Sequence, residues 1–374
     1  MFVTLADGTE NILSNGGAFE AIDENNIDGA VYSRQDLTFN GSGTLTVTSP
    51  AGHGIVCKDD LVFTGGTYIV SSASHGMDAN DSVRIAEASI TIDAGKDGIH
   101  AENKDDASLG FVYILSGTMD IEAEGDGISA GVYLQVQDGT INLLVGGGYE
   151  NGTSQNSASY GEFKGSGKPG RSSARMVPEE KSRNMSAPEE SSTSMTTSEE
   201  SRTSMKGLKA VSGILISNGM ITIDSADDSI HSDTSVIING GTFEIASGDG
   251  LDSNGTLTIS DGYIYVANPT AGDTSIIDAD VSPVITGGTF ISTGSTTMMA
   301  QTFASSSTQG VISCTTGTQS PGSVVTVKDS NGNRVISYEV EYSCALVIIS
   351  SPDIVKGDAY TLTIGSTSGS VQAE

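Results

Sequence analysis

Aspartates recur directly before glycine along this chain, and their side chains could bind a metal ion. Asp97 and Asp126 each precede a glycine, and Asp228 and Asp249 lie 21 residues apart at equivalent positions. Two carboxylates that lie close together repel each other, and one takes up a proton unless a cation lies between them. Calcium suits such a site, because it accepts about six to eight oxygen ligands in irregular geometry.

The segment that follows Gly98 brings further carboxylates next to the first pair. We therefore predict that Ca²⁺ is the cofactor and that its ligands are Asp97, Glu102, Asp105, Asp106, Asp126, Asp228 and Asp249. The alternative is that Asp-Gly is only a favourable turn dipeptide. For any single aspartate that alternative is the better explanation, whereas the crowding around Asp97 and Asp126 favours metal binding.

A repeat of about 22 residues positions these side chains. Gly54, Gly76 and Gly98 lie 22 residues apart, and equivalent positions recur, with insertions, up to Ile276. Each repeat holds three short apolar segments that alternate with period two, a pattern typical of strands. Three strands per repeat indicate an all-β fold, a parallel β-helix of about nine coils, in which each coil buries its apolar face against its neighbours.

Within a repeat, the position two residues after the origin faces outward and is mostly polar. We predict that four side chains of this column bind carbohydrate: His100, Lys209, His231 and Asp252. The next position faces inward and holds only small residues, among them Cys57, which we interpret as a core residue. Stacking on Tyr113, Tyr133 or Tyr149 is a further possibility for a neutral glucan, although tyrosines are also ordinary packing residues.

Composition and charge exclude several classes of function. The chain has 374 residues with 17 Lys and Arg against 47 Asp and Glu, a net charge of −30. This charge excludes nucleic acid as a partner bound through its phosphates, and it disfavours an anionic membrane surface. No apolar stretch is long enough to span a bilayer. Three cysteines without a CxxC motif and four histidines make a zinc site improbable. We expect a monomer.

The repeat and its interruptions divide the chain into segments. We expect an N-terminal cap at 1–29 and the β-helix at 30–297. An insertion at 149–206 is rich in Ser, Thr, Gly, Lys and Glu, and we expect it to be disordered. Beyond residue 298 the period stops, and an Asn-Gly hairpin signal indicates a small antiparallel β module at 298–374. Cys314 and Cys344 lie in that module and could form a disulfide or remain free.

The ordered repeats resemble a known family. The segments "DGIHAENKDDASLGFVYILSGTMDIEAEGDGISA" and "MKGLKAVSGILISNGMITIDSADDSIHSDTSVIINGGTFEIASGDGL", with both chain ends, resemble bacterial carbohydrate-binding β-helix proteins. The resemblance implies a right-handed parallel β-helix, Ca²⁺ binding, a distant similarity to pectate lyases, and an extracellular or cell-surface location. The chain shows no signal peptide, so we expect its start to be truncated. His53 and His75 stand where that family would have aspartate.

Three functions are compatible with this sequence. The leading interpretation, which the resemblance implies, is a non-catalytic protein that binds plant-type polysaccharide: acidic sugars such as polygalacturonate, cellulose, or both. The second is a Ca²⁺-dependent polysaccharide lyase of the pectate type, for which Lys209 would be the candidate base. The third is a structural spacer at the cell surface. Because the surroundings of Lys209 are acidic and favour its charged form, we expect binding without cleavage.

Overall fold

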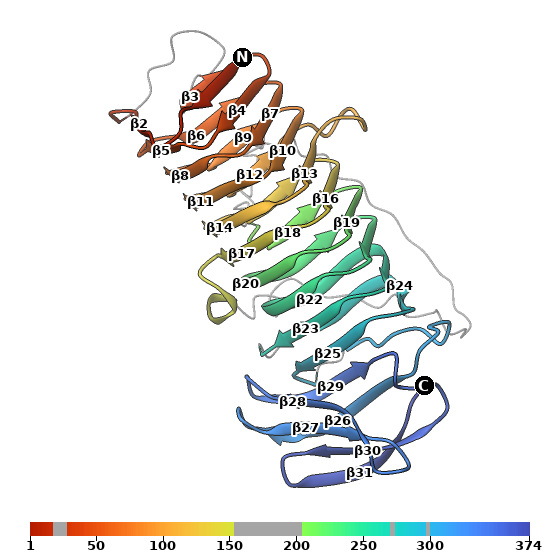
Figure 1. The fold of residues 1–374 in the computed structure, drawn as a ribbon. Helices are drawn as coiled ribbons and strands as arrows, with labels where there is room; N and C mark the ends of the chain where they lie inside the picture. The colour runs from red at the N-terminus through yellow and green to blue at the C-terminus, as the bar shows by residue number, and fades with distance from the viewer. Residues whose placement is uncertain (18–27, 153–203, 270–273, 297–299) are drawn as a thin grey trace, which may run out of the picture. The chain divides into compact units, whose positions relative to one another are not determined.

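The computed structural model describes residues 1–17, 28–152, 204–269, 274–296 and 300–374. In this part of the chain all regular structure is β-strand except one short 3₁₀ turn, η1 (Tyr149–Asn151). Figure 1 shows parallel strands that pair from one coil to the next, followed by a smaller antiparallel sheet at the C-terminal end. The predicted fold class, a parallel β-helix with a small antiparallel β module, is confirmed.

Each coil contributes a strand to each of three faces. The first face holds short strands, and two of them carry the predicted site residues His100 and Lys209: β3 (Gly29–Ser33), β6 (His53–Cys57), β9 (Met77–Ala79), β12 (Ile99–Ala101), β15 (Ile128–Ala130) and β18 (Leu208–Ala210). The second face follows in each coil: β1 (Phe2–Leu5), β4 (Leu37–Gly41), β7 (Asp60–Thr64), β10 (Ser82–Ala86), β13 (Phe111–Ile114), β16 (Tyr133–Val136), β19 (Gly213–Ile216) and β21 (Ser235–Ile238).

The third face completes the coil with longer strands: β2 (Glu10–Ser14), β5 (Thr44–Ser49), β8 (Thr67–Ser72), β11 (Ala88–Ala94), β14 (Gly117–Ala123), β17 (Thr140–Val145), β23 (Tyr263–Asn268) and β25 (Thr289–Gly294). In the later coils some strands run on from one face to the next: β20 (Met220–Ser232), β22 (Thr242–Ile259) and β24 (Ile277–Ile285).

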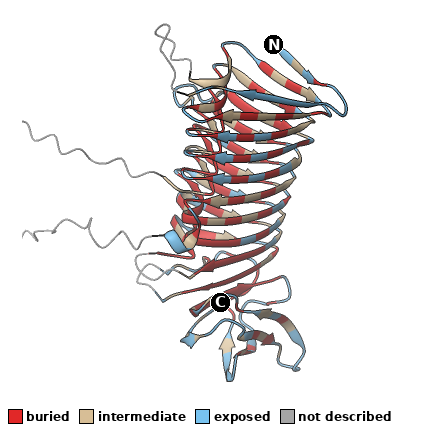
Figure 2. Cartoon of the chain, turned by 90° about the vertical axis from the view of Figure 1, so that its left-hand side faces the viewer, coloured by how far each residue is buried: buried red, intermediate tan, exposed pale blue. Residues whose placement is uncertain are grey.

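The core forms because apolar residues alternate with polar ones along each strand. In β11, Ile90 and Ile92 point inward and are buried, whereas Thr91 and Asp93 point outward and are exposed. Figure 2 shows the same alternation of buried and exposed residues in coil after coil. The predicted inward column of small residues is also present, because Cys57, Ala79 and Ala101 pair in register on neighbouring strands and all three are buried. A strand pattern with period two thus gives one continuous core.

The glycine at the origin of the repeat is required by the close approach of neighbouring coils. A Cβ atom on Gly98 would lie 2.3 Å from Ile121 Cγ2 and 2.7 Å from the carbonyl oxygen of Gly127. Gly54 and Gly76 meet the equivalent carbonyl groups of the following coils. In these three coils glycine is therefore required because no side chain fits at this position.

The C-terminal part covers the last coils with antiparallel strands. β29 (Cys344–Ser350) pairs antiparallel with β25 and with β26 (Val311–Gln319). The small sheet consists of β27 (Val324–Lys328), β28 (Arg334–Glu339), β30 (Ala359–Ile364) and β31 (Thr367–Gln372). Its side chains share a second apolar cluster with Tyr265 and Ile291 of the β-helix. The structure places Cys314 and Cys344 in β26 and β29 as free thiols.

The insertion predicted at 149–206 falls largely on residues 153–203, which lie outside the described residues. On either side of it the register continues without a shift, because Ser129 of β15 pairs with Lys209 of β18. At the N-terminal end, β1 and β2 pair in parallel with β4 and β5. A search of the described residues for a helix that could cross a bilayer finds none.

Candidate functional site

The predicted carbohydrate-binding column lies on the first face in the order that the repeat requires. His100 pairs with Ser129, Ser129 with Lys209, Lys209 with His231, and His231 with Asp252. The column is much less exposed than the sequence suggested, however. Asp78, Ser129 and His231 are each at most 9% exposed, because neighbouring charged side chains pair with one another across the coils.

Lysines neutralise two of the predicted metal ligands. The ammonium group of Lys209 lies 2.8 Å from Asp126 Oδ2, and Asp126 is buried. Lys206 forms a very short contact with the buried carboxylate of Asp228 and lies 3.2 Å from Asp227. Since a buried carboxylate needs a nearby positive charge, these two lysines supply the compensation for which we had invoked a metal ion.

The carboxylates also accept hydrogen bonds from the backbone of the next coil. The amide of Asp126 donates to Asp97 Oδ1 at 2.8 Å, and the amide of Lys206 donates to Asp126 Oδ1 at 2.9 Å. Further along, the amide of Ser275 donates to Asp249 Oδ1 at 2.6 Å. This ladder gives the aspartates a structural role, because each satisfies a backbone donor that would otherwise be unpaired inside the turn.

The loop that carries Glu102, Asp105 and Asp106 is bound by its own contacts. The amides of Asp105 and Asp106 both donate to Asn103 Oδ1, and Glu102 lies 3.6 Å from Lys58 Nζ. Among the described residues, the groups of metal-capable side chains whose donor atoms lie within 4.8 Å of one another include Asp97 and the pair Asp228 and Asp249. They include neither Asp126 nor any of the three loop residues.

A histidine occupies the centre of the second acidic set. His231 Nδ1 lies 2.5 Å from Asp252 Oδ2 and 3.0 Å from Asp228 Oδ2, and Nε2 lies 3.0 Å from Asp233 Oδ1. Although burial opposes the charged form, the hydrogen bonds with Asp228 and Asp252 raise the pKa of His231 to about 10. Burial, offset partly by the Ser275 amide, and the charges of Asp228 and Asp227 raise the pKa of Asp249 to about 7.

One group of carboxylates was not predicted. Asp36, Asp59 and Asp60 lie together where the first face turns into the second. Partial burial and the charges of Asp36 and Asp81 raise the pKa of Asp59 above its usual value. The signal was present in the sequence, because Asp36, Asp59 and Asp81 recur at spacings of 23 and 22 residues. The prediction did not include this group because it considered only the residues that precede each glycine, and those lie at the other corner of the coil.

An aromatic groove lies on the second face, beside the loop of Glu102 to Asp106. It has a volume of about 320 Å³. Its lining is Ala107, Ser108, Phe111, Val112, Tyr113, Tyr133 and Gln135. Tyr133 is 50% exposed, and the guanidinium of Arg84 lies 5.1 Å from the centroid of Phe111. Tyr149, the third tyrosine considered as a platform, packs edge-on against Tyr342 instead.

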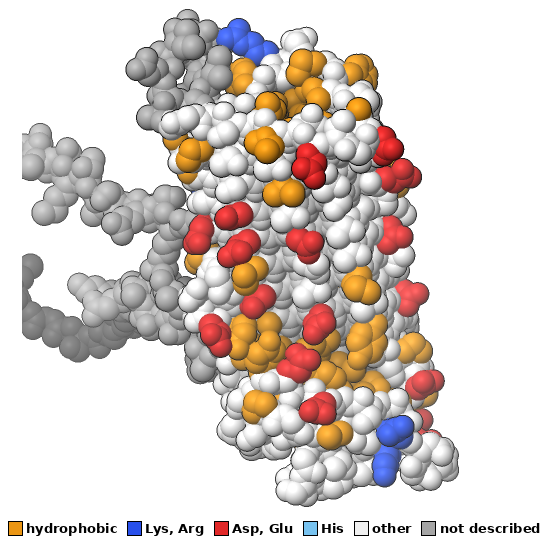
Figure 3. Space-filling view, turned by 60° about the vertical axis from the view of Figure 1, so that its left-hand side comes forward, with side chains coloured by type: hydrophobic (Ala, Val, Ile, Leu, Met, Phe, Trp, Pro, Cys, Tyr) orange, Lys and Arg blue, Asp and Glu red, His pale blue; other side chains and the backbone are white. Residues whose placement is uncertain are grey.

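A second groove, of about 350 Å³, lies on the third face across β11, β14 and β17. Asp93, Asp120 and Glu122 contribute carboxylates to it, and Asn142 donates a hydrogen bond to Asp120 at 2.6 Å. Figure 3 shows acidic side chains spread over this side of the molecule, with basic ones visible only near its two ends. This groove lacks aromatic side chains and repels anions.

Comparisons with known proteins point to one family. A family model described as "Carbohydrate-binding domain-containing protein" matches residues 1–253. A protein of the same description from Acetivibrio thermocellus is 39% identical over 70 residues, which cover 18% of this chain and 24% of that protein. A solved structure titled as the polysaccharide lyase-like protein from C. thermocellum, gadolinium derivative, is 36% identical, covers 39% of this chain and 60% of that one, and has a TM-score of 0.38. The chain thus spans about a quarter of the curated relative.

Proposed function

Because the chain belongs to the family of carbohydrate-binding domain-containing proteins, we propose that it binds polysaccharide without cleaving it. The sugars that we propose are acidic polysaccharides such as polygalacturonate, or cellulose. The observation that carries this proposal is the aromatic groove on the second face. Sugar rings present apolar C–H faces that pack against aromatic side chains, while nearby polar groups bind their hydroxyls.

The groove offers both kinds of contact. Tyr113 and Tyr133 extend from neighbouring strands, β13 and β16, and Gln135 pairs in register with Tyr113. Ala107 and Ser108 belong to the insertion that follows Gly98, so this loop forms one wall of the groove. The carboxylate-rich segment that suggested a metal site from the sequence would on this proposal shape a sugar site.

We further propose that Ca²⁺ binds at Asp36, Asp59 and Asp60 and bridges to the carboxylate of an acidic sugar. Here three carboxylates converge with no lysine between them in the described part of the chain, although Arg84 lies 3.1 Å from Asp60 Oδ2. Asp60 pairs with Ser82, and Ser82 pairs with Phe111. The cation would therefore lie about 10 Å from the aromatic groove, two strand spacings along the same face.

In the alternative function, a polysaccharide lyase, Lys209 would be the base that removes a proton from the substrate. Its ammonium group is engaged by the buried carboxylate of Asp126, so it is poorly placed to remove a proton from a substrate. This contact favours binding without cleavage. The spacer alternative requires no site and does not explain a groove lined by three aromatic rings.

A retention experiment with the full chain tests the proposal. Purified protein would be mixed with insoluble cellulose and with immobilised polygalacturonate, each with calcium and with chelator. We expect retention on at least one polymer, and calcium-dependent retention on polygalacturonate. Ultraviolet absorbance of soluble polygalacturonate should stay flat in the presence of protein and calcium. No retention on either polymer, or a steady rise in absorbance that is lost in Lys209→Ala, would contradict a binding-only function.

A further inference from the structure

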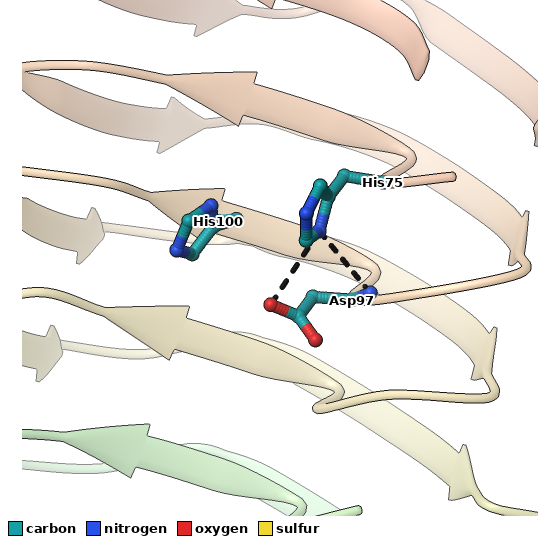
Figure 4. Close-up of side chains that lie close together, drawn as sticks. All are labelled: His75, Asp97 and His100. Atoms are coloured by element: carbon teal, nitrogen blue, oxygen red, sulfur yellow. Dashed lines mark hydrogen bonds and ion pairs between the residues drawn. The ribbon is translucent and has the colours of Figure 1, made fainter. Parts of the chain in front are cut away.

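Three of the four histidines form a stack on the first face. The ring centroids of His53 and His75 are 5.0 Å apart, and those of His75 and His100 are 4.8 Å apart, with interplanar angles of 17° and 18°. The repeat brings them together from three successive coils. Figure 4 shows Asp97 directly below His75, with His100 beside them.

Two atoms with lone pairs, both hydrogen-bond acceptors, face each other in this cluster. The backbone amide of Asp97 donates to His75 Nδ1 at 3.3 Å, so Nδ1 carries a lone pair and not a proton. The same Nδ1 lies 3.4 Å from Asp97 Oδ2. Two ligand atoms bound to one tetrahedral zinc ion at about 2.0 Å are about 3.3 Å apart. The pair therefore already has the separation that a shared metal ion would impose.

His100 supplies a third donor that is already oriented. Its Nδ1 is hydrogen-bonded at 2.9 Å to Asp78 Oδ1, and Asp78 is buried. Its Nε2 has no protein partner among the described residues. A histidine that ligates a metal through one nitrogen commonly gives its other N–H to a carboxylate, which fixes the ring. One donor atom from each of His75, Asp97 and His100 lies within 4.8 Å of the others. A small inward shift of these side chains would therefore bring all three donor atoms onto one metal ion.

We propose that His75, Asp97 and His100 bind a divalent transition-metal ion, Zn²⁺ in the first instance, with Asp78 as the positioning residue of His100. Two imidazoles and one carboxylate form a ligand set that zinc accepts and that Ca²⁺, which prefers oxygen ligands only, does not. The three side chains are 16 to 18% exposed, which leaves a fourth coordination position open to water. The small number of histidines made such a site improbable from composition, but the coils place three of the four side by side.

The other histidine-containing cluster provides a contrast. Asp228, His231 and Asp252 also lie within 4.8 Å of one another. Both ring nitrogens of His231 already have carboxylate partners, and Lys206 binds Asp228. That cluster is neutralised by its own side chains, so His231 serves as the matched control.

Cobalt and zinc titrations of the full chain, after treatment with chelator, test the proposal. We expect wild-type protein to bind one Co²⁺ with visible d–d absorption, Zn²⁺ to displace it, and an excess of Ca²⁺ to leave the spectrum unchanged. His75→Gln and His100→Gln should lose the absorption, and His231→Gln should keep it. Asp78→Asn, which alters no ligand, should weaken binding by about 10- to 100-fold.

Circular dichroism melting of each variant would separate loss of the fold from loss of the site, and Asp78→Asn tests the assignment even if a ligand variant unfolds. Absence of saturable Co²⁺ and Zn²⁺ binding by the wild type would overturn the proposal and leave His75 and Asp97 as neighbours with no ion between them. Equal affinities in wild type, His75→Gln and His100→Gln would overturn it as well. Neither result bears on polysaccharide retention, which depends on a different face.

Discussion

Lys209 Nζ lies 2.8 Å from Asp126 Oδ2, so a lysine occupies the place beside this carboxylate where we had predicted a calcium ion. The two residues are distant in sequence, on either side of the insertion, and meet because β15 and β18 are adjacent strands. The crowding of aspartates on the first face is thus compensated from within the chain.

Replacing Lys209 with methionine should destabilise the fold. The change leaves the buried carboxylate of Asp126 without its partner, and we expect the free energy of unfolding to fall by roughly 2 to 4 kcal/mol, less than for a fully buried pair because Lys209 is partly exposed. The double variant Lys209→Met/Asp126→Asn should recover most of the loss. Urea denaturation would measure both. Equal stability of Lys209→Met and wild type would show that the pair contributes nothing.

Adding one methyl group at the origin of a coil should also be costly. In Gly98→Ala the new Cβ would collide with Ile121 Cγ2 and with the backbone of Gly127, so we expect a loss of roughly 1 to 3 kcal/mol. Gly369→Ala is the matched control, since no atom lies within 4 Å of the corresponding Cβ. Thermal denaturation compares the two. A Gly98→Ala protein as stable as the control would mean that the coils can separate without cost.

Stability should depend on pH through His231. Its folded pKa of about 10 lies above the unfolded value of about 6.5, so its contribution is complete below pH 6.5 and is lost as the pH rises through 10. We expect the urea midpoint of the wild type to fall between pH 6.5 and 10, and His231→Gln to show a shallower fall. Parallel pH profiles for the two proteins would be incompatible with a charged, ion-paired His231.

The thiols should differ in reactivity. Burial raises the pKa of Cys57 and of Cys344, so both should react slowly with a thiol reagent in the native state. Cys314 is more exposed and should react first. The reaction of native protein would be compared with that of protein unfolded in urea, where all three should react. Rapid modification of all three in the native state would indicate that the coil around Cys57 opens readily.

Much of the fold could be predicted because the repeat fixes it. The period of the glycines placed Ser129, Lys209 and His231 on one column, and the structure has that order. A parallel ladder transmits register from coil to coil, so a single period determines many contacts. The column of small inward residues follows from the same rule.

The site was harder to predict because a column shows which residues are neighbours but not where their side chains point. Nothing in the spacing showed that Lys206 would bend onto Asp228, or that the Asp97 amide would reach the ring of His75. These contacts depend on side-chain rotamers and on the bends between faces. Tyr113 and Tyr133 of the aromatic groove were candidates from the sequence, but the wall beside them was not, since Ala107 and Ser108 belong to a loop outside the repeat.

The most direct test of the central claim is the affinity of groove variants for polysaccharide. Wild type, Tyr113→Ala, Tyr133→Ala and Tyr263→Ala would be compared by calorimetry or affinity electrophoresis on the polymer that retains the wild type. Tyr263 is 45% exposed on the third face and serves as the control. We predict that each groove variant binds about tenfold or more weakly, as is usual when an anchoring aromatic side chain is truncated, and that Tyr263→Ala binds like wild type. Unchanged affinity in both groove variants would contradict our placement of the sugar site.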